Sequence, residues 1–205
     1  MKLYFHPFSS NARRAVITQK LLGVAAELVF VDLAKGAQRA PEFLALNPNH
    51  AVPVLVDDDF VLTESHAIMI YLAEGTPGQS LYPADRRARA QVNRWMFWCS
   101  NHWSPAISGL NFEHSLKKMF GQGDADPAQV ARHERFFHQF AAVLDAQLAT
   151  RAWVTGESLT LADISLATPL MYAAPAKLPL EGYPHITAWM KRVEALPAWQ
   201  ETSAG

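Results

Sequence analysis

The stretch that decides the fold is AVPVLVDDDFVLTESHAIMIYLAE, Ala51–Glu74. Two β-prone runs, VPVLV and FVL, flank the acidic turn Asp57–Asp59, which is the pattern of a β-hairpin. The residues that follow, Glu64–Glu74, carry apolar side chains at helical spacing. The stretch therefore predicts two antiparallel strands followed by a helix.

The sequence before this stretch predicts a strand, a helix and a second strand. Lys2–Phe5 is short and β-prone, and Ala12–Leu22 has a helical pattern that ends at Gly23, where a C-cap is expected. LVFVDL, Leu28–Leu33, is a nearly continuous apolar run, which is typical of a buried parallel strand. Such a start implies a right-handed crossover between two parallel strands. We therefore predict the order β-α-β, then β-β-α.

The pattern changes at GTPGQSLYPADRR, Gly75–Arg87, where Gly, Pro and Ser cluster as in a linker. Beyond it the sequence is almost entirely helical, with predicted helices at Arg86–Ile107, Pro127–Thr150, Leu161–Tyr172 and Pro184–Leu196. Thr160 and Asp163 have the spacing of a capping box, with Asp in the usual Glu position. We expect one domain over residues 1–77 and a helical domain over residues 85–205.

Composition restricts the classes of function. The 205 residues are 50% hydrophobic and carry a formal net charge of -1, which gives no electrostatic argument for binding nucleic acid or an anionic membrane. No apolar run approaches the roughly 18 residues of a membrane helix, and MKLYFHPF lacks the apolar region of a signal peptide. The single cysteine, Cys99, excludes an internal disulfide, so we expect a cytoplasmic protein.

Three motifs resemble one known family. AVPVL, Ala51–Leu55, looks like the thioredoxin-fold strand that begins with a cis-proline. TESHAIMIYLAE is similar to the E-S-x-A-I-x-x-Y-L motif of glutathione S-transferases, and LTLADISL resembles the capping motif of their helical domain. The resemblance covers essentially the whole chain. It implies an α/β thioredoxin-like N-terminal domain, an all-α C-terminal domain, glutathione as co-substrate without a metal, a homodimer and a role in detoxification.

Two positions in the decisive stretch suit the ends and the backbone of glutathione. Ser65 is expected to be the N-cap of its helix, where its N–H and hydroxyl suit a carboxylate, while Glu64 suits an ammonium group. The alternative is a plain serine cap after a surface glutamate. A cis bond between Val52 and Pro53 would leave the Val52 backbone facing outward to pair with a peptide; the alternative is an ordinary trans proline.

HPFSSNARR, His6–Arg14, places a polar cluster where a strand gives way to a helix. The resemblance is to the serine-type, theta- and phi-like bacterial members, whose segment reads S-x-x-x-R, and it makes Ser9 the catalytic serine, paired with Arg13. A hydroxyl that donates to sulfur stabilises the thiolate of glutathione, whose free pKa is about 8.5. Ser10 and Asn11 are alternatives, and Ser9 could simply cap the helix.

The chain departs from the serine-type pattern at two places. Ala51 stands where Gln or Lys usually contacts the glutathione backbone, so we consider His50 as a neighbouring substitute. Gln38 stands where a His often meets the glycyl end, and Lys35 and Arg39 are nearby cations for the glycyl carboxylate. These changes bear on affinity and class rather than on the fold.

The second substrate, a small-molecule electrophile, would lie against the helical domain. RWMFWCSNHW carries an apolar stripe at helical spacing, which most often means core or dimer contact. By analogy with the family, the candidates for the electrophile pocket are Phe8, Trp98, His102, Trp103 and Phe112. His133 and His138 are five residues apart on a helix, which does not suit a shared metal ion.

The first hypothesis for the function is a glutathione transferase. A non-catalytic protein of the same fold that binds ligands or a partner is the second hypothesis, and a glutathione-dependent disulfide reductase or peroxidase is the third. The sequence does not identify the electrophile.

Overall fold

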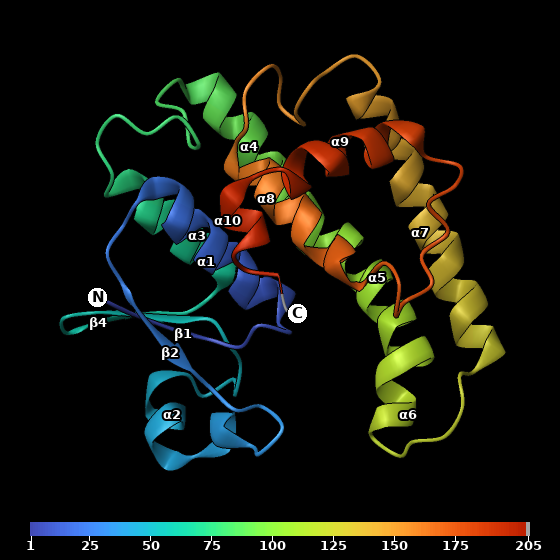
Figure 1. The fold of residues 1–205 in the computed structure, drawn as a ribbon, viewed down its shortest axis with the longest axis horizontal. Helices are drawn as coiled ribbons and strands as arrows, with labels where there is room; N and C mark the ends of the chain where they lie inside the picture. The colour runs from blue at the N-terminus through green and yellow to red at the C-terminus, as the bar shows by residue number, and fades with distance from the viewer. Residues whose placement is uncertain (204–205) are drawn as a thin grey trace. The chain divides into compact units, whose positions relative to one another are not determined.

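The computed structural model describes residues 1–203 and divides into two compact units (Figure 1). The first comprises Met1–Tyr82 together with the C-terminal segment from Ala195, and the second comprises Pro83–Glu194. The last helix, α10 (Pro197–Gln200), therefore belongs to the first unit and contacts its helix α1.

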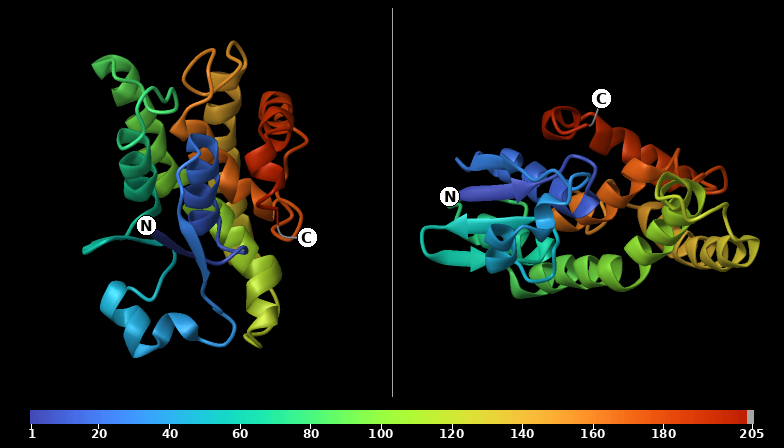
Figure 2. Two further views of the ribbon diagram at one scale, coloured as in Figure 1. Left: turned by 60° about the vertical axis from the view of Figure 1, so that its left-hand side comes forward. Right: turned by 90° about the horizontal axis from the view of Figure 1, so that it is seen from below.

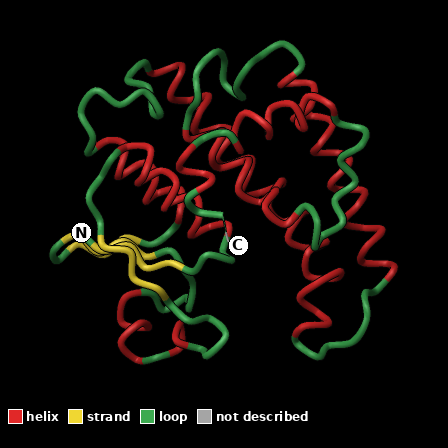
Figure 3. The backbone as a smooth tube through the Cα atoms, in the orientation of Figure 1, coloured by secondary structure: helices red, strands yellow, loops and turns green. Residues whose placement is uncertain are grey.

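The first unit is built on a four-stranded sheet of order β2-β1-β3-β4 (Figure 3). Strand β1 (Lys2–Phe5) pairs in parallel with β2 (Glu27–Phe30) and antiparallel with β3 (Val54–Asp57). Strand β4 (Phe60–Leu62) pairs antiparallel with β3, which confirms the hairpin around the acidic turn. The parallel pair and the crossover helix α1 (Ser10–Leu22) were also expected.

The expectation of a buried second strand was wrong. Strand β2 lies at the edge of the sheet, ends three residues earlier than predicted, and leaves the side chains of Leu28 and Phe30 38% and 56% exposed. An apolar run of strand length does not by itself distinguish a central strand from an edge strand, because that depends on the pairing of other segments.

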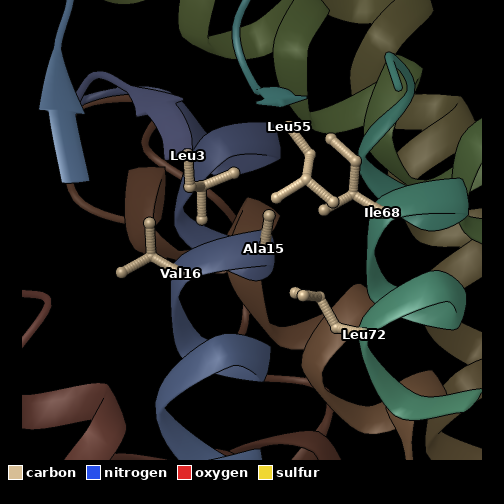
Figure 4. Packing of buried hydrophobic residues seen from close by; sticks show 6 residues of the cluster. All are labelled: Leu3, Ala15, Val16, Leu55, Ile68 and Leu72. Carbon is tan, nitrogen blue, oxygen red and sulfur yellow. The ribbon is translucent and has the colours of Figure 1, made fainter. Parts of the chain in front are cut away.

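Helices α1 and α3 (Ser65–Glu74) pack together on one face of the sheet, and α2 (Pro41–Leu46) covers the other (Figures 1 and 2). Alternate residues of the strands point to opposite faces. Leu3 and Leu55 meet the helical residues Ala15 and Ile68 on the first face (Figure 4). Phe43 of α2 contacts the ring of Tyr4 edge-on from the other side. The sheet thus has an apolar core on each of its faces.

The second unit begins with a helical run that is longer than predicted. Helices α4 (Arg86–Trp98), α5 (Ser104–Asn111) and α6 (Lys117–Met119) are joined by two π-helical turns, η2 (Cys99–Trp103) and η3 (Phe112–Leu116). Pro105 has no N–H to offer the carbonyl one turn earlier, which accounts for the wider turn at η2. The remaining elements are α7 (Pro127–Leu148), α8 (Leu161–Ala167), the 3₁₀ turn η4 (Thr168–Tyr172) and α9 (Pro184–Glu194).

The capping box expected at Thr160 and Asp163 is present at the start of α8. Asp163 is completely buried, and its carboxylate accepts hydrogen bonds from the Val154 N–H (2.8 Å), the Thr160 N–H (2.9 Å) and the Trp189 indole (3.1 Å). Burial raises the pKa of this carboxyl, and the hydrogen bonds oppose that shift.

Candidate active site

Ser9 lies between the end of β1 and the start of α1. Its backbone is extended (φ -96°, ψ 112°), and its Oγ accepts a hydrogen bond from the Ala12 N–H at 3.2 Å, so Ser9 is the N-cap of α1. A hydroxyl that accepts in this way still has its own hydrogen to donate. Within residues 1–203 no acceptor for that hydrogen is in place. The cap therefore leaves a donor at the positive end of a 13-residue helix.

The other polar residues of this segment have different surroundings. Ser10 is the first residue of α1 and is half-buried, whereas Asn11 is exposed. The backbone N–H of Arg13 donates to the Ser9 carbonyl at 2.8 Å, but its guanidinium turns toward the C-terminal segment. The pairing of Ser9 with Arg13 is thus a backbone hydrogen bond rather than a side-chain contact.

The peptide bond between Val52 and Pro53 is cis, as expected. Val52 is buried and lies just before β3 begins, so it is outside the β1–β3 ladder. Sequence reasoning missed Asn47, which organises this loop. The buried Asn47 side chain donates to the Ala51 carbonyl at 2.7 Å and accepts from the Asn49 N–H at 3.0 Å. The Asn-Pro dipeptide at 47–48 is a turn signal that pointed to it.

The N-cap of helix α3 lies one residue earlier than predicted. Glu64, not Ser65, is the N-cap, because the chain turns at Glu64 (φ 67°, ψ 112°) and becomes helical only at Ser65. Positive φ is unusual for a residue with a Cβ and indicates a constrained position. The Glu64 side chain is exposed, Ser65 is buried, and no side chain caps the first turn. No side-chain cap therefore competes with an outside acceptor at this turn.

A partly buried contact joins helices α1 and α3. The Arg14 guanidinium of α1 donates to His66 Nε2 in the first turn of α3 at 2.8 Å. Burial, and then the charge of Arg14, lower the pKa of His66 from 6.5 to about 3, so the imidazole is neutral at physiological pH. Sequence reasoning missed this pair, which no local pattern reveals.

The other glutathione candidates are Lys35 and Gln38, expected at the glycyl end, and His50, expected as the substitute beside Ala51; Gln38 lies in the 3₁₀ turn η1 (Ala37–Arg39). Lys35 is 86% exposed and sits 3.4 Å from the Asp32 carboxylate, whose pKa is lowered chiefly by the Lys35 backbone N–H. The Gln38 amide lies 3.4 Å from the Leu33 carbonyl, and its buried Oε1 has no hydrogen-bond partner within the described chain. His50 is exposed, with φ 55°, and its backbone N–H bonds the Asn47 carbonyl.

The chain matches two protein-family models, "Glutathione S-transferase, N-terminal domain" over residues 1–74 and "Glutathione S-transferase, C-terminal domain" over residues 112–197. The chain belongs to the glutathione S-transferase family. This confirms the family and the fold class expected from the sequence.

Individual relatives are similar to this chain over nearly its full length. Glutathione S-transferase 3 of Zea mays is 37% identical over 100% of this chain and 93% of its own. Among solved structures, glutathione transferase F7 of Populus trichocarpa has a TM-score of 0.90 at 28% identity, covering 98% of this chain and 97% of the other. A glutathione S-transferase-I bound with lactoylglutathione has a TM-score of 0.87, also at 28% identity, with the same coverage of both chains.

The candidates for the electrophile pocket of this family member fall in both units. Phe8, in the first unit, is 64% exposed. In the second unit, Trp98 and Phe112 are half-buried and His102 is exposed beside the Phe140 ring, with 5.1 Å between centroids.

One of the pocket candidates is wrong. Trp103 is completely buried, and its indole donates to the Leu166 carbonyl at 2.9 Å. It has no surface to offer a ligand, so we assign it to the core of the second unit. Cys99 is also fully buried and contacts the Ser165 carbonyl, which confirms that it is a small core residue.

Residues 1–203 contain no group of three or more His, Cys, Asp or Glu side chains arranged to hold a metal ion. None of their helices is both long and apolar enough to cross a membrane.

Proposed function

We propose that this protein is a glutathione transferase in which the Ser9 hydroxyl stabilises the glutathione thiolate. The observation that carries the proposal is the geometry of Ser9: its oxygen is held by the Ala12 N–H while its hydrogen remains free to donate at a helix start. A free thiol has a pKa of about 8.5, and a donor together with the helix dipole lowers it.

The reaction needs no group that removes a proton from serine. The bound thiol loses its proton to solvent, and the thiolate sulfur attacks an electrophilic carbon. A C–S bond forms, and the leaving group or the adjacent π bond takes the electron pair. Serine stays uncharged throughout and acts only as a donor.

The start of α3 supplies the second half of the proposed site. Its first-turn amides and the Ser65 hydroxyl suit the carboxylate of the γ-glutamyl group, because no side chain caps that turn. Glu64, exposed and held at positive φ, suits the ammonium group. The Val52 backbone suits the peptide of the tripeptide, and Lys35, Gln38 and His50 remain candidates for its other polar groups.

The test records the ultraviolet absorbance of glutathione thiolate against pH with wild type, Ser9→Ala, Ser10→Ala and Asn11→Ala. We expect the bound thiol to ionise at least about one unit below its free pKa in wild type. Ser9→Ala should remove most of that shift, whereas the neighbouring variants keep it. Loss in Ser10→Ala or Asn11→Ala instead would transfer the role to that residue.

Binding without ionisation, or no binding of glutathione, would contradict the enzyme proposal. The second outcome favours a ligand-binding protein of the same fold. Exchange with a low-molecular-weight disulfide, measured on the same protein, separates a disulfide reductase from a transferase acting on carbon electrophiles.

A homodimer and a cytoplasmic location are part of the proposal. Each unit exposes large apolar side chains, Phe60 and Val61 on β4 and Phe97 on α4, the last being 65% exposed. Sedimentation should give about twice the 22.8 kDa chain mass for wild type, and Phe97→Glu should weaken the dimer. Chemistry that uses reduced glutathione suits a reducing compartment.

A further inference from the structure

Arg13 joins the candidate catalytic serine to the far end of the chain. It stands in the first turn of α1, and its backbone N–H donates to the Ser9 carbonyl in the first hydrogen bond of the helix. Only 5% of Arg13 is exposed. A long charged side chain is buried when its head group is satisfied within the protein.

The head group meets the C-terminal segment at several points. Its Nη2 donates to the Trp199 carbonyl at 3.0 Å and to Ser203 Oγ at 3.1 Å, and its Nε donates to Thr202 Oγ1 at 3.3 Å. The guanidinium carbon lies 3.9 Å from the centroid of the Trp199 ring. This combination of forked donors and ring stacking is specific to arginine.

The acceptors are themselves held in place. The Thr202 and Ser203 hydroxyls both donate to the Trp199 carbonyl, at 3.0 and 3.1 Å, and Trp199 is buried. The guanidinium therefore contacts the C-terminal end of α10, where a helix favours positive charge. The network is rigid because each member is bonded to at least one other.

A second tie between the same elements is of a different kind. Lys20, on the second half of α1, contacts Glu201 at 2.7 Å, but Glu201 is 58% exposed. Exposed ion pairs contribute little. Lys20 and Glu201 also border a hollow of about 240 Å³ across which Pro7, in the loop before Ser9, faces the C-terminal segment. Of these two ties, the buried Arg13 contacts therefore hold the C-terminal segment against the first turn of α1 more strongly than the exposed Lys20–Glu201 pair does.

We propose that Arg13 is a positioning residue: through it, the C-terminal segment 196–203 holds the first turn of α1 and so sets the direction of the Ser9 hydroxyl toward the glutathione sulfur. The proposal rests on the proposed function of Ser9. Hydrogen bonds weaken steeply when the donor is misaligned, so a small rotation of this turn reduces thiolate stabilisation without removing any group that binds glutathione.

The test uses two variants and one control. Arg13→Lys keeps the charge but loses the fork and the stacking, and the double variant Thr202→Ala/Ser203→Ala keeps Arg13 and removes two acceptors. Lys20→Gln removes the exposed tie and is the control. The readouts are the pKa of the bound thiol, kcat and KM for glutathione below that pKa, and the thermal midpoint.

We expect the bound thiol pKa to rise by half a unit to one unit in both test variants, so that kcat below the pKa falls about threefold to tenfold. KM for glutathione should change less than about twofold, because the groups that bind the tripeptide remain. Lys20→Gln should behave as wild type. All values are taken at temperatures well below the onset of unfolding of the least stable variant.

The outcomes separate the two proposals. A wild type that ionises bound thiol no better than free glutathione would contradict the role of Ser9 and, with it, that of Arg13. A lowered wild-type pKa that persists in both test variants would overturn the role of Arg13 alone. An equal rise in Lys20→Gln would also overturn it, because the effect would then be general loosening of the segment.

Discussion

Helices α3 and α8 begin in opposite ways. The start of α8 is saturated: Asp163 is completely buried and accepts from two backbone N–H groups and an indole. The start of α3 is open, with no side-chain cap and with its N-cap residue, Glu64, held at a positive φ. The first arrangement gives buried donors around the helix start an acceptor within the protein, whereas the second has no side-chain acceptor at its first turn. The difference separates a helix start used for stability from one available to a ligand.

The largest expected effect comes from breaking the saturated start. Asp163→Ala leaves three buried N–H donors without an acceptor and also removes an acceptor of the Thr160 hydroxyl. Each unpaired N–H costs about 1–3 kcal/mol, so the free energy of unfolding should fall by at least about 3 kcal/mol. Asp85→Ala is the matched control, because Asp85 caps α4 through the Arg87 and Ala88 N–H groups on an exposed turn. We expect that variant to lose about 1 kcal/mol. Denaturant titrations measure both variants. If they lose the same free energy of unfolding, burial of the capping residue makes no difference to its contribution.

The next effect concerns His66, in the first turn of α3. Its pKa is 6.5 when unfolded and about 3 when folded, so the unfolded state takes up the proton first as the pH falls. The contribution of His66 to the free energy of unfolding is therefore complete above pH 6.5 and is lost as the pH falls from 6.5 to about 3.

Between pH 7 and 5, wild type should lose about 2 kcal/mol more stability than His66→Gln, which keeps an acceptor for Arg14 but does not titrate. His185→Gln is the control, because it removes an exposed histidine on α9. Parallel stability curves for wild type and His66→Gln would show that His66 titrates normally in the folded protein.

The smallest expected effect on stability comes from replacing Glu64, the N-cap of α3. Glycine adopts positive φ without steric cost, so Glu64→Gly should raise the free energy of unfolding by up to about 1 kcal/mol. The same change removes the carboxylate, so KM for glutathione should rise about tenfold.

Glu64→Ala removes the same carboxylate and keeps the backbone restriction. It should weaken glutathione binding equally but give no gain in thermal midpoint. If Glu64→Gly is less stable than Glu64→Ala, the positive φ does not cost the wild type anything measurable.

The local features of both units could be predicted from the sequence. The hairpin around Asp57–Asp59, the C-cap at Gly23 and the box at Thr160 and Asp163 depend on residues within a few positions of one another. Turn and cap preferences act at that range, so short patterns carry them. The cis bond before Pro53 and the family came from motifs of the same kind.

Part of the candidate site could be predicted for the same reason. Ser9 and Ser65 stand at helix starts, and helix starts are marked in sequence. The exact cap of α3 was not predicted, because serine is the commoner cap and nothing local requires Glu64 at positive φ.

The tertiary structure alone decided which partners distant residues have. Strand β2 is exposed because it lies at the edge of the sheet, Trp103 is core because α8 offers it a carbonyl, and Arg13 is buried because the C-terminal segment returns to α1. The sequence by itself determined the hairpin, the capping box of α8 and the family. It did not determine burial or long-range hydrogen bonds, because these depend on which surfaces meet after the elements have formed, and no pattern within a single element encodes the surface that it will meet.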